Sequence, residues 1–248
     1  MEGGIEVVLK ATTLGEVWGI PITNALVMTW VAMALIFIFV FIVRRRMSLI
    51  PGKLQAGLEL AVEGGLSYTK ETLENQKLAE RFFPLIAGLT IFIATINELE
   101  FFPGVGSIGF FHEGGEFVPL LRASTTDLNT TLALTLISVL TVEVMGVVSL
   151  GFFRYAGKFI SFKSPVKFVV GLIELVSEIS RLITFSFRLF GNIFAGEVLI
   201  AIVAFFVPYV LPAPFMLFEM FVGVVQGVIF ALLTLFFLKL AIMPGEGH

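Results

Sequence analysis

The residues best placed for chemistry lie in one strongly apolar stretch, residues 177–200. Arg188 stands between Phe187 and Leu189, and no acidic residue lies within one helical turn of it. Arginine keeps its proton inside proteins, and a charge at mid-bilayer costs about 2.5–3.5 kcal/mol on insertion scales. A charge kept at this cost indicates a function. The alternative is an arginine that snorkels to the membrane surface.

Several polar residues would share a helical face with this arginine. At about 100° per residue, the side chains that fall within about 40° of one line are Glu174, Glu178, Arg181, Arg188, Asn192 and Gly196. Glu178 can pair with Arg181 at the i,i+3 spacing. Arg188 then remains the cation that has no acid on its own helix.

A second polar stripe follows on the last apolar segment, where Glu219, Gly223 and Gln226 share a face. The spacing of Gly223 and Gly227 allows close approach of another helix. If the two stripes pack antiparallel, Glu219 lies near Glu197 towards the outside. Gln226 then lies deeper, towards the arginine.

Two acidic groups therefore flank the arginine. Asn97 and Glu100, at the end of an earlier apolar run, are expected to join the outer group, whereas Glu174, Glu178 and Glu143 lie on the inner side. Two polar routes that end at a fixed positive charge can pass protons only through an intermediary. We expect that intermediary to be a carboxylate on another protein.

The composition indicates a helical membrane protein. Of the 248 residues, 57% are hydrophobic and 14% are charged, against about 25% charged in soluble domains. The mean hydropathy is +1.00, and apolar runs of about 20 residues match a transmembrane helix. The chain has no cysteine and two histidines, so we expect no disulfide and no metal centre. We also expect no cofactor, no catalytic residue and no nucleic-acid partner.

The chain is predicted to be a single all-α membrane domain over residues 1–248, with five embedded helices and one amphipathic surface helix. The surface segment covers residues 53–81, with a candidate break at Gly64 and Gly65. The embedded segments are residues 26–43, 82–102, 127–150, 166–207 and 215–243. Pro84 is expected in a first helical turn, and residues 125–127 are candidate helix caps.

The last two segments are predicted to form a long, strongly tilted hairpin. About 40 helical positions in residues 166–207 span about 60 Å, twice the ~30 Å of hydrocarbon in a bilayer. The alternative is a helix broken at Gly171, Gly191 or Gly196.

Basic residues set the expected orientation. Arg44–Arg46 end the first span, and the loop at residues 151–165 carries basic residues and no acid. Positive flanks stay on the cytoplasmic side. We therefore expect the N-terminus outside and the C-terminus inside. The compact length of the chain suggests a bacterial protein, and hence a bacterial plasma membrane.

The run Arg-Leu-Phe-Gly-Asn at residues 188–192, followed by Ala-Gly-Glu at residues 195–197, resembles the signature of subunit a of rotary F-type ATP synthases of the bacterial type. The segment at residues 126–131 resembles the opening of another family helix. The chain departs from the family pattern at Ser124 and Leu182, where prolines are usual.

This resemblance implies a non-catalytic stator subunit that passes protons to and from a rotating c ring through two half-channels. The implied ion-translocation residues are Arg188, Asn192, Glu197, Glu219 and Gln226. Asn97 and Glu100 would line the outer access path, and an inner or positioning role would fall to Arg181, Glu178 and Glu174. The implied partners are the c ring, subunit b, the rest of the Fo/F1 complex and the lipid bilayer.

The resemblance assigns no role to Glu143. Two other classes of function remain open from the residues alone. A secondary transporter or stand-alone ion channel should show an internal repeat, and the sequence shows none. A membrane scaffold would not need Arg188 or the polar stripes.

Overall fold

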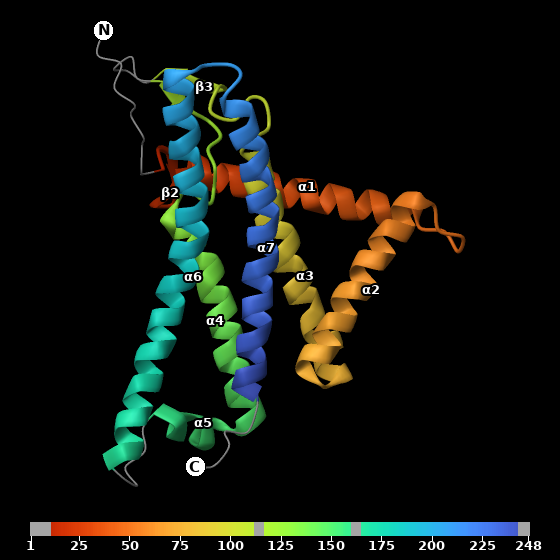
Figure 1. Cartoon of the computed structure of the whole chain (residues 1–248), viewed down its shortest axis with the longest axis vertical. Helices are drawn as coiled ribbons and strands as arrows, with labels where there is room; N and C mark the ends of the chain where they lie inside the picture. Colours follow the sequence, from red (N-terminus) through yellow and green to blue (C-terminus); the bar gives the residue numbers. More distant parts are fainter. Residues whose placement is uncertain (1–10, 112–116, 160–164, 243–248) are drawn as a thin grey trace.

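The computed structural model describes residues 11–111, 117–159 and 165–242. Within these ranges the chain forms seven helices and four short strands (Figure 1). Four helices, α3, α4, α6 and α7, form an elongated bundle, α1 and α2 extend from one side of it, and α5 lies across one end. Five helices in this part of the chain are long and apolar enough to cross a membrane, which confirms the predicted number.

The first helix, α1 (Asn24–Arg46), is the first apolar span. The Thr23 hydroxyl accepts a hydrogen bond from the backbone N–H of Leu26 at 3.2 Å, which caps the helix. The helix ends in its three arginines. Most of its second half, which ends in these arginines, is exposed, so in the membrane lipid or another protein covers it.

The predicted surface segment at residues 53–81 is wrong in its boundaries. Helix α2 (Lys53–Leu73) passes through Gly64 and Gly65 without a break and stops where Glu74 adopts a left-handed backbone, φ 52°. The Asn75 side chain then caps α3 (Gln76–Leu99) by accepting from the backbone N–H of Leu78. Helix α3 therefore starts earlier than predicted, and Pro84 lies in its interior.

Helix α4 (Leu128–Leu150) begins after Asp127, whose carboxylate caps it by accepting from the backbone N–H of Asn129 at 3.0 Å. This confirms a cap within residues 125–127. The residues after Gly151, predicted as a loop, include a short helix, α5 (Phe152–Phe159). Gly151 has φ 83°, which turns the chain sharply between the two helices.

Helices α6 (Pro165–Phe206) and α7 (Pro212–Ile242) form the predicted hairpin. The 42 residues of α6 correspond to about 63 Å, and the helix continues through all three of its glycines. In Figure 1, α1 runs across the direction of α6 and α7, so the three helices cannot all stand along one membrane normal. The length and the crossing both favour a strong tilt.

The described residues also form two antiparallel hairpins that were not predicted. The first pairs β1 (Thr13–Val17) with β2 (Ile20–Thr23), and the second pairs β3 (Gly109–Phe111) with β4 (Phe117–Pro119). Asn24 links them, because its Nδ2 donates to the carbonyl of Pro119 at 3.2 Å and its Oδ1 accepts from the N–H of Thr12.

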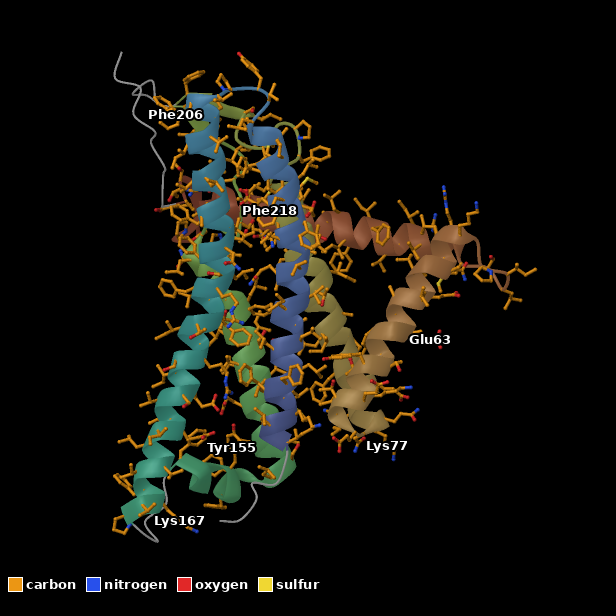
Figure 2. All side chains as sticks on the ribbon, in the orientation of Figure 1. Glu63, Lys77, Tyr155, Lys167, Phe206 and Phe218 are labelled. Carbon is orange, nitrogen blue, oxygen red and sulfur yellow. The ribbon has the colours of Figure 1, made fainter. Side chains whose placement is uncertain are left out.

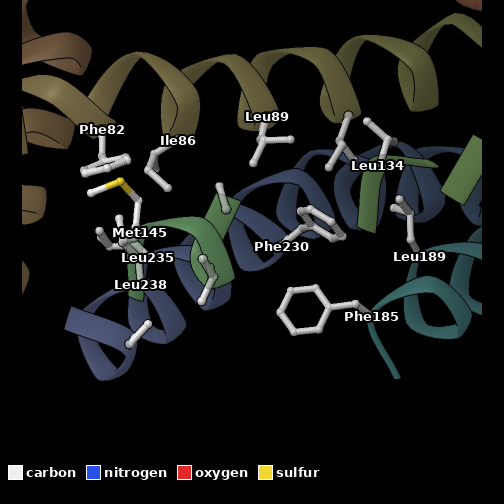
Figure 3. Packing of buried hydrophobic residues seen from close by; sticks show 14 of the residues in the cluster. Phe82, Ile86, Leu89, Leu134, Met145, Phe185, Leu189, Phe230, Leu235 and Leu238 are labelled. Carbon is white, nitrogen blue, oxygen red and sulfur yellow. The ribbon is translucent and has the colours of Figure 1, made fainter. Parts of the chain in front are cut away.

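The core lies where α3, α4, α6 and α7 meet (Figure 3). Phe185 of α6 packs edge-on against Phe230 of α7, with ring centroids 5.2 Å apart. Helix α3 approaches α7 closely at two glycines. A Cβ on Gly227 would lie 2.8 Å from the Thr90 carbonyl oxygen and 3.1 Å from the Ala94 nitrogen. The predicted close approach at Gly223 and Gly227 is confirmed.

We expect Gly227→Ala to separate α3 from α7, because the added methyl meets backbone atoms that cannot rotate away. Overpacking of this kind costs about 1–3 kcal/mol. Thermal unfolding of the purified protein in detergent should show a lowered midpoint. Gly57→Ala on the exposed face of α2 is the matched control: its Cβ meets nothing within 4 Å, and alanine should favour the helix by about 1 kcal/mol. Equal midpoints for the two variants would contradict the close packing.

Candidate functional site

Glu219 of α7 is buried directly against α6. Its side chain is 4% exposed, and neither carboxylate oxygen has a hydrogen-bond partner among the described residues. A Cβ on Gly196 of α6 would overlap this carboxylate. The absence of a side chain at position 196 is therefore what lets the acid lie between the two helices.

Asn97 of α3 is the second buried polar group at this level. Its Nδ2 donates to the carbonyl of Gly223 at 3.0 Å, while its Oδ1 is buried and has no partner in the described part of the chain. A Cβ on Gly223 would lie 2.9 Å from the Cβ of Asn97. Gly223 thus allows the asparagine to reach the α7 backbone.

Glu100, Glu197 and Arg122 line a cavity of about 430 Å³ next to these groups. Burial, followed by the negative charges of Glu197 and Glu219, raises the pKa of Glu100 to about 9, although the positive charge of Arg122 acts in the opposite direction. Glu100 is thus a proton-binding carboxyl at neutral pH. Arg122 was not among the residues predicted for the site, although the sequence shows it as a cation in the outer loop.

The predicted outer residues, Asn97, Glu100, Glu197 and Glu219, therefore lie together, and they form what we call the acidic cluster. Three of these four side chains are carboxyls. A site with this composition can bind and release cations or protons. The single Asn97 supplies both a donor and an acceptor.

Asn192 and Gln226 connect α6 and α7 about one to two turns further from the α6–α7 turn than Glu197 and Glu219. The Asn192 amide donates to Gln226 Oε1 at 2.8 Å. Gln226 is buried and Asn192 is exposed on the open face of the hairpin. The two predicted stripes thus meet as expected.

Arg188 lies one turn from Asn192 on the same face. Its guanidinium carbon is 5.8 Å from the centroid of the Phe185 ring, and within the described ranges it forms no hydrogen bond or ion pair. Its side chain is partly exposed. This guanidinium can therefore meet an anion that another protein brings.

Two separate hollows lie along the hairpin, one on each side of this level. One, of about 320 Å³, is lined by Asn192, Gly196 and Glu219, among others. The other, of about 290 Å³, is lined by Arg188, Arg181 and neighbouring residues of α6 and α7. Arg188 lines one hollow and Asn192 lines the other, so these two residues stand where the two hollows approach each other.

The ion pair predicted between Glu178 and Arg181 is confirmed at 2.7 Å. The Arg181 guanidinium also lies 3.8 Å from the centroid of the Phe237 ring. The ring contact holds Arg181 against α7, whereas the ion pair lies within α6. Glu174 lies one turn before Glu178 on α6 and is partly exposed. It does not lie near the acidic cluster.

Known proteins resemble most of this chain. The sequence model of the family described as ATP synthase A chain matches residues 26–239. ATP synthase subunit a of Moorella thermoacetica is 32% identical over 216 residues, which cover 87% of this chain and 89% of that protein. The subunits a of Campylobacter jejuni and Desulfotalea psychrophila are each 34% identical, over 82% and 83% of this chain and 83% and 79% of their own lengths.

The raised pKa of Glu100 predicts how stability depends on pH. The folded protein keeps this proton up to about pH 9, whereas the unfolded chain releases it near pH 4.5. Since the unfolded state then binds fewer protons, stability falls as pH rises through this window and levels off above it. We expect Glu100→Gln to flatten this decline in thermal-midpoint measurements. Equal slopes in wild type and Glu100→Gln would contradict the assignment of this proton to Glu100. Glu63→Gln is the control, because Glu63 lies on the exposed face of α2 (Figure 2).

Proposed function

The chain belongs to the ATP synthase subunit a family, and we propose that it conducts protons to and from the rotating c ring through two half-channels. Membership makes it a multi-pass membrane subunit of the ATP synthase complex. The family relationship supports the stator role. Passage of protons past a c ring is our proposal.

One observation carries this proposal: the two hollows on the α6–α7 hairpin are separated at Arg188 and Asn192. A conductor that worked alone would need a continuous path. Two hollows that end at a fixed cation instead require a mobile carrier. A carboxyl on a ring that moves past the hairpin meets this requirement.

In the proposed mechanism Arg188 attracts the ring carboxyl and favours its ionised form, since a nearby opposite charge lowers a carboxyl pKa. The proton leaves before the carboxylate passes the arginine, and a proton from the other hollow binds afterwards. Asn192 and Gln226 hold the hairpin closed beside this point. The fixed positive charge also repels protons that would leak directly between the hollows.

The acidic cluster is proposed to line the outer access path, with Glu197 and Glu219 nearest the ring and Asn97 and Glu100 behind them. Glu100, which retains its proton at neutral pH, is suited to relay protons. On the other side, Glu174 and Glu178 are the proposed inner acids. Arg181 is a positioning residue, since its charge is already paired.

We propose that the N-terminus is outside and the C-terminus inside a bacterial plasma membrane. Three arginines end α1, and basic flanks favour the cytoplasmic side. Lys239 in the last turn of α7 donates to Glu74 at the α2–α3 junction at 2.8 Å, so these ends share one face. Subunit b and the c ring are the proposed partners for the exposed faces of α1 and of the hairpin.

We expect Arg188→Ala to reduce proton-driven ATP synthesis in membrane vesicles to background while the complex still assembles, because the ring carboxyl loses its counter-charge. Synthesis rate and co-purification with the c ring are measured together. Arg81→Ala, an exposed arginine of α3, is the matched control and should leave synthesis unchanged. Retained synthesis in Arg188→Ala would refute the role given to this residue, and proton conduction by the isolated chain would favour a stand-alone channel.

The orientation is testable by labelling, because the chain contains no cysteine of its own. Ser48→Cys and Gly157→Cys should react with a membrane-impermeant maleimide only from the cytoplasmic face. Ile108→Cys, at an exposed position of the outer loop, should react only from the opposite face. The reverse pattern would invert the proposed topology.

A further inference from the structure

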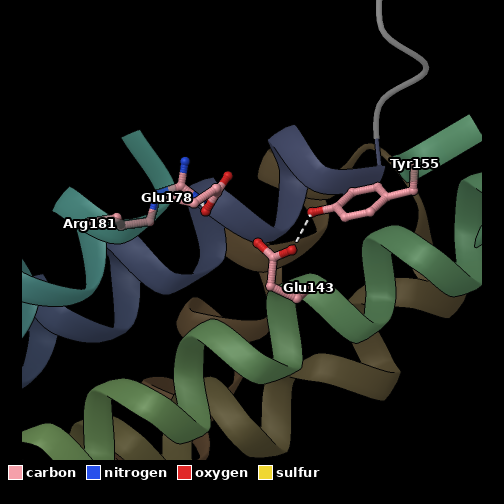
Figure 4. A network of polar contacts seen from close by, with 4 residues as sticks. All are labelled: Glu143, Tyr155, Glu178 and Arg181. Atoms are coloured by element: carbon pink, nitrogen blue, oxygen red, sulfur yellow. Dashed lines mark hydrogen bonds and ion pairs between the residues drawn. The ribbon is translucent and has the colours of Figure 1, made fainter. Parts of the chain in front are cut away.

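Glu143 is an intramembrane carboxyl that neither the hairpin mechanism nor the family resemblance uses. It lies in the last third of α4, and the Tyr155 hydroxyl of α5 donates to its Oε2 at 2.9 Å (Figure 4). This contact joins a membrane-spanning helix to the short helix that crosses the end of the bundle. A polar pair at this point is outside the acidic cluster and on the opposite side of Arg188.

The tyrosine occupies a slot made for its ring. A Cβ on Gly146, one turn after Glu143, would overlap the Tyr155 ring. The ring is 5% exposed and packs edge-on against Phe159, with centroids 5.5 Å apart. The position of the hydroxyl is thus fixed by packing and not only by its hydrogen bond.

The two oxygens of Glu143 differ in what they contact. Oε2 accepts the tyrosine hydroxyl, whereas Oε1 is buried and has no hydrogen-bond partner among the described residues. Burial and the bond to Glu143 raise the pKa of Tyr155, so the phenol keeps its proton and remains a donor. Oε1 is therefore the oxygen free to take a proton.

Charged groups of α6 face this pair. Figure 4 shows Glu178 and Arg181 across from Glu143 and Tyr155, and their charges act on the tyrosine hydroxyl. Helix α5 packs against both α4 and α6. Glu143 consequently lies between the inner acids of α6 and the end of the bundle that α5 covers.

We propose that Glu143 is a proton-binding group at the inner mouth of the path, and that Tyr155 is the positioning residue that holds it. This inference rests on the proposed function. A proton that leaves the ring towards the inside binds Oε1 and converts the carboxylate to the acid. It then passes to water at the inner surface and regenerates the carboxylate, and ATP-driven pumping reverses these steps. Tyr155 keeps its own proton throughout.

Passive proton conduction through Fo in vesicles stripped of F1 tests this proposal. A positioned proton-transfer group commonly contributes about 100-fold or more to a rate. Because water can partly replace such a group near the surface, we expect Glu143→Gln to slow conduction on the order of tenfold. The matched controls Glu63→Gln and Tyr209→Phe, both at exposed positions, should conduct as wild type.

Tyr155→Phe separates positioning from a purely structural role. It keeps the ring in its slot and removes only the hydroxyl that donates to Glu143. We expect the dependence of conduction on inner pH to change, with the dependence on outer pH unchanged. An unchanged inner-pH profile would overturn the role of Tyr155.

The two proposals fail in different ways. If Glu143→Gln conducts at the wild-type rate while Arg188→Ala abolishes synthesis, the Glu143 site is overturned and the proposed function stands. If Arg188→Ala sustains synthesis, the proposed function fails. Should Glu143→Gln not assemble, Glu143→Asp replaces it: slower conduction with a shifted inner-pH profile supports the site, and a wild-type profile overturns it.

Discussion

The α6–α7 hairpin depends on one constraint: polar side chains in apolar surroundings need space and a partner between helices that touch. Glycine supplies the space at Gly196, Gly223 and Gly227, where a Cβ would meet Glu219, Asn97 and the α3 backbone respectively. A larger residue at Gly196 would separate α6 from α7, and a larger residue at Gly223 or Gly227 would separate α7 from α3. The buried acid, the Asn97 bond to α7 and the contact between Asn192 and Gln226 all require the short distance that the glycines allow.

The same constraint separates the charges of α6 into two kinds. Arg181 has an acid at 2.7 Å and an aromatic ring at 3.8 Å, so its cost of burial is offset within the chain. Arg188 is partly exposed and has neither an acid nor a hydrogen bond among the described residues. In a medium where water cannot compensate, this difference indicates that the counter-charge of Arg188 comes from another protein.

Local patterns in the sequence were enough to predict the five spans, the unbroken hairpin and the meeting of its two polar stripes, since helical periodicity decides these features. The α2–α3 break, helix α5 and the two hairpins were missed or misplaced because they depend on single residues or distant contacts. Asn24 bonds to Pro119 across 95 positions, and Tyr155 reaches Glu143 only because Gly146 is small. Arg122 was visible as a charge, but only the fold places it beside Glu100.

Under the proposed function, the tilt of the hairpin explains how one carrier can reach both hollows. In an upright hairpin, hollows at different depths would lie on one line along the membrane normal, and a carrier would have to move through the membrane. In a leaning hairpin the same hollows are displaced sideways as well as in depth. A carboxyl that stays at one depth on a rotating ring then meets them in succession, with Arg188 between them. The length of α6 is therefore a functional requirement of the proposed mechanism, beyond what spanning the bilayer demands.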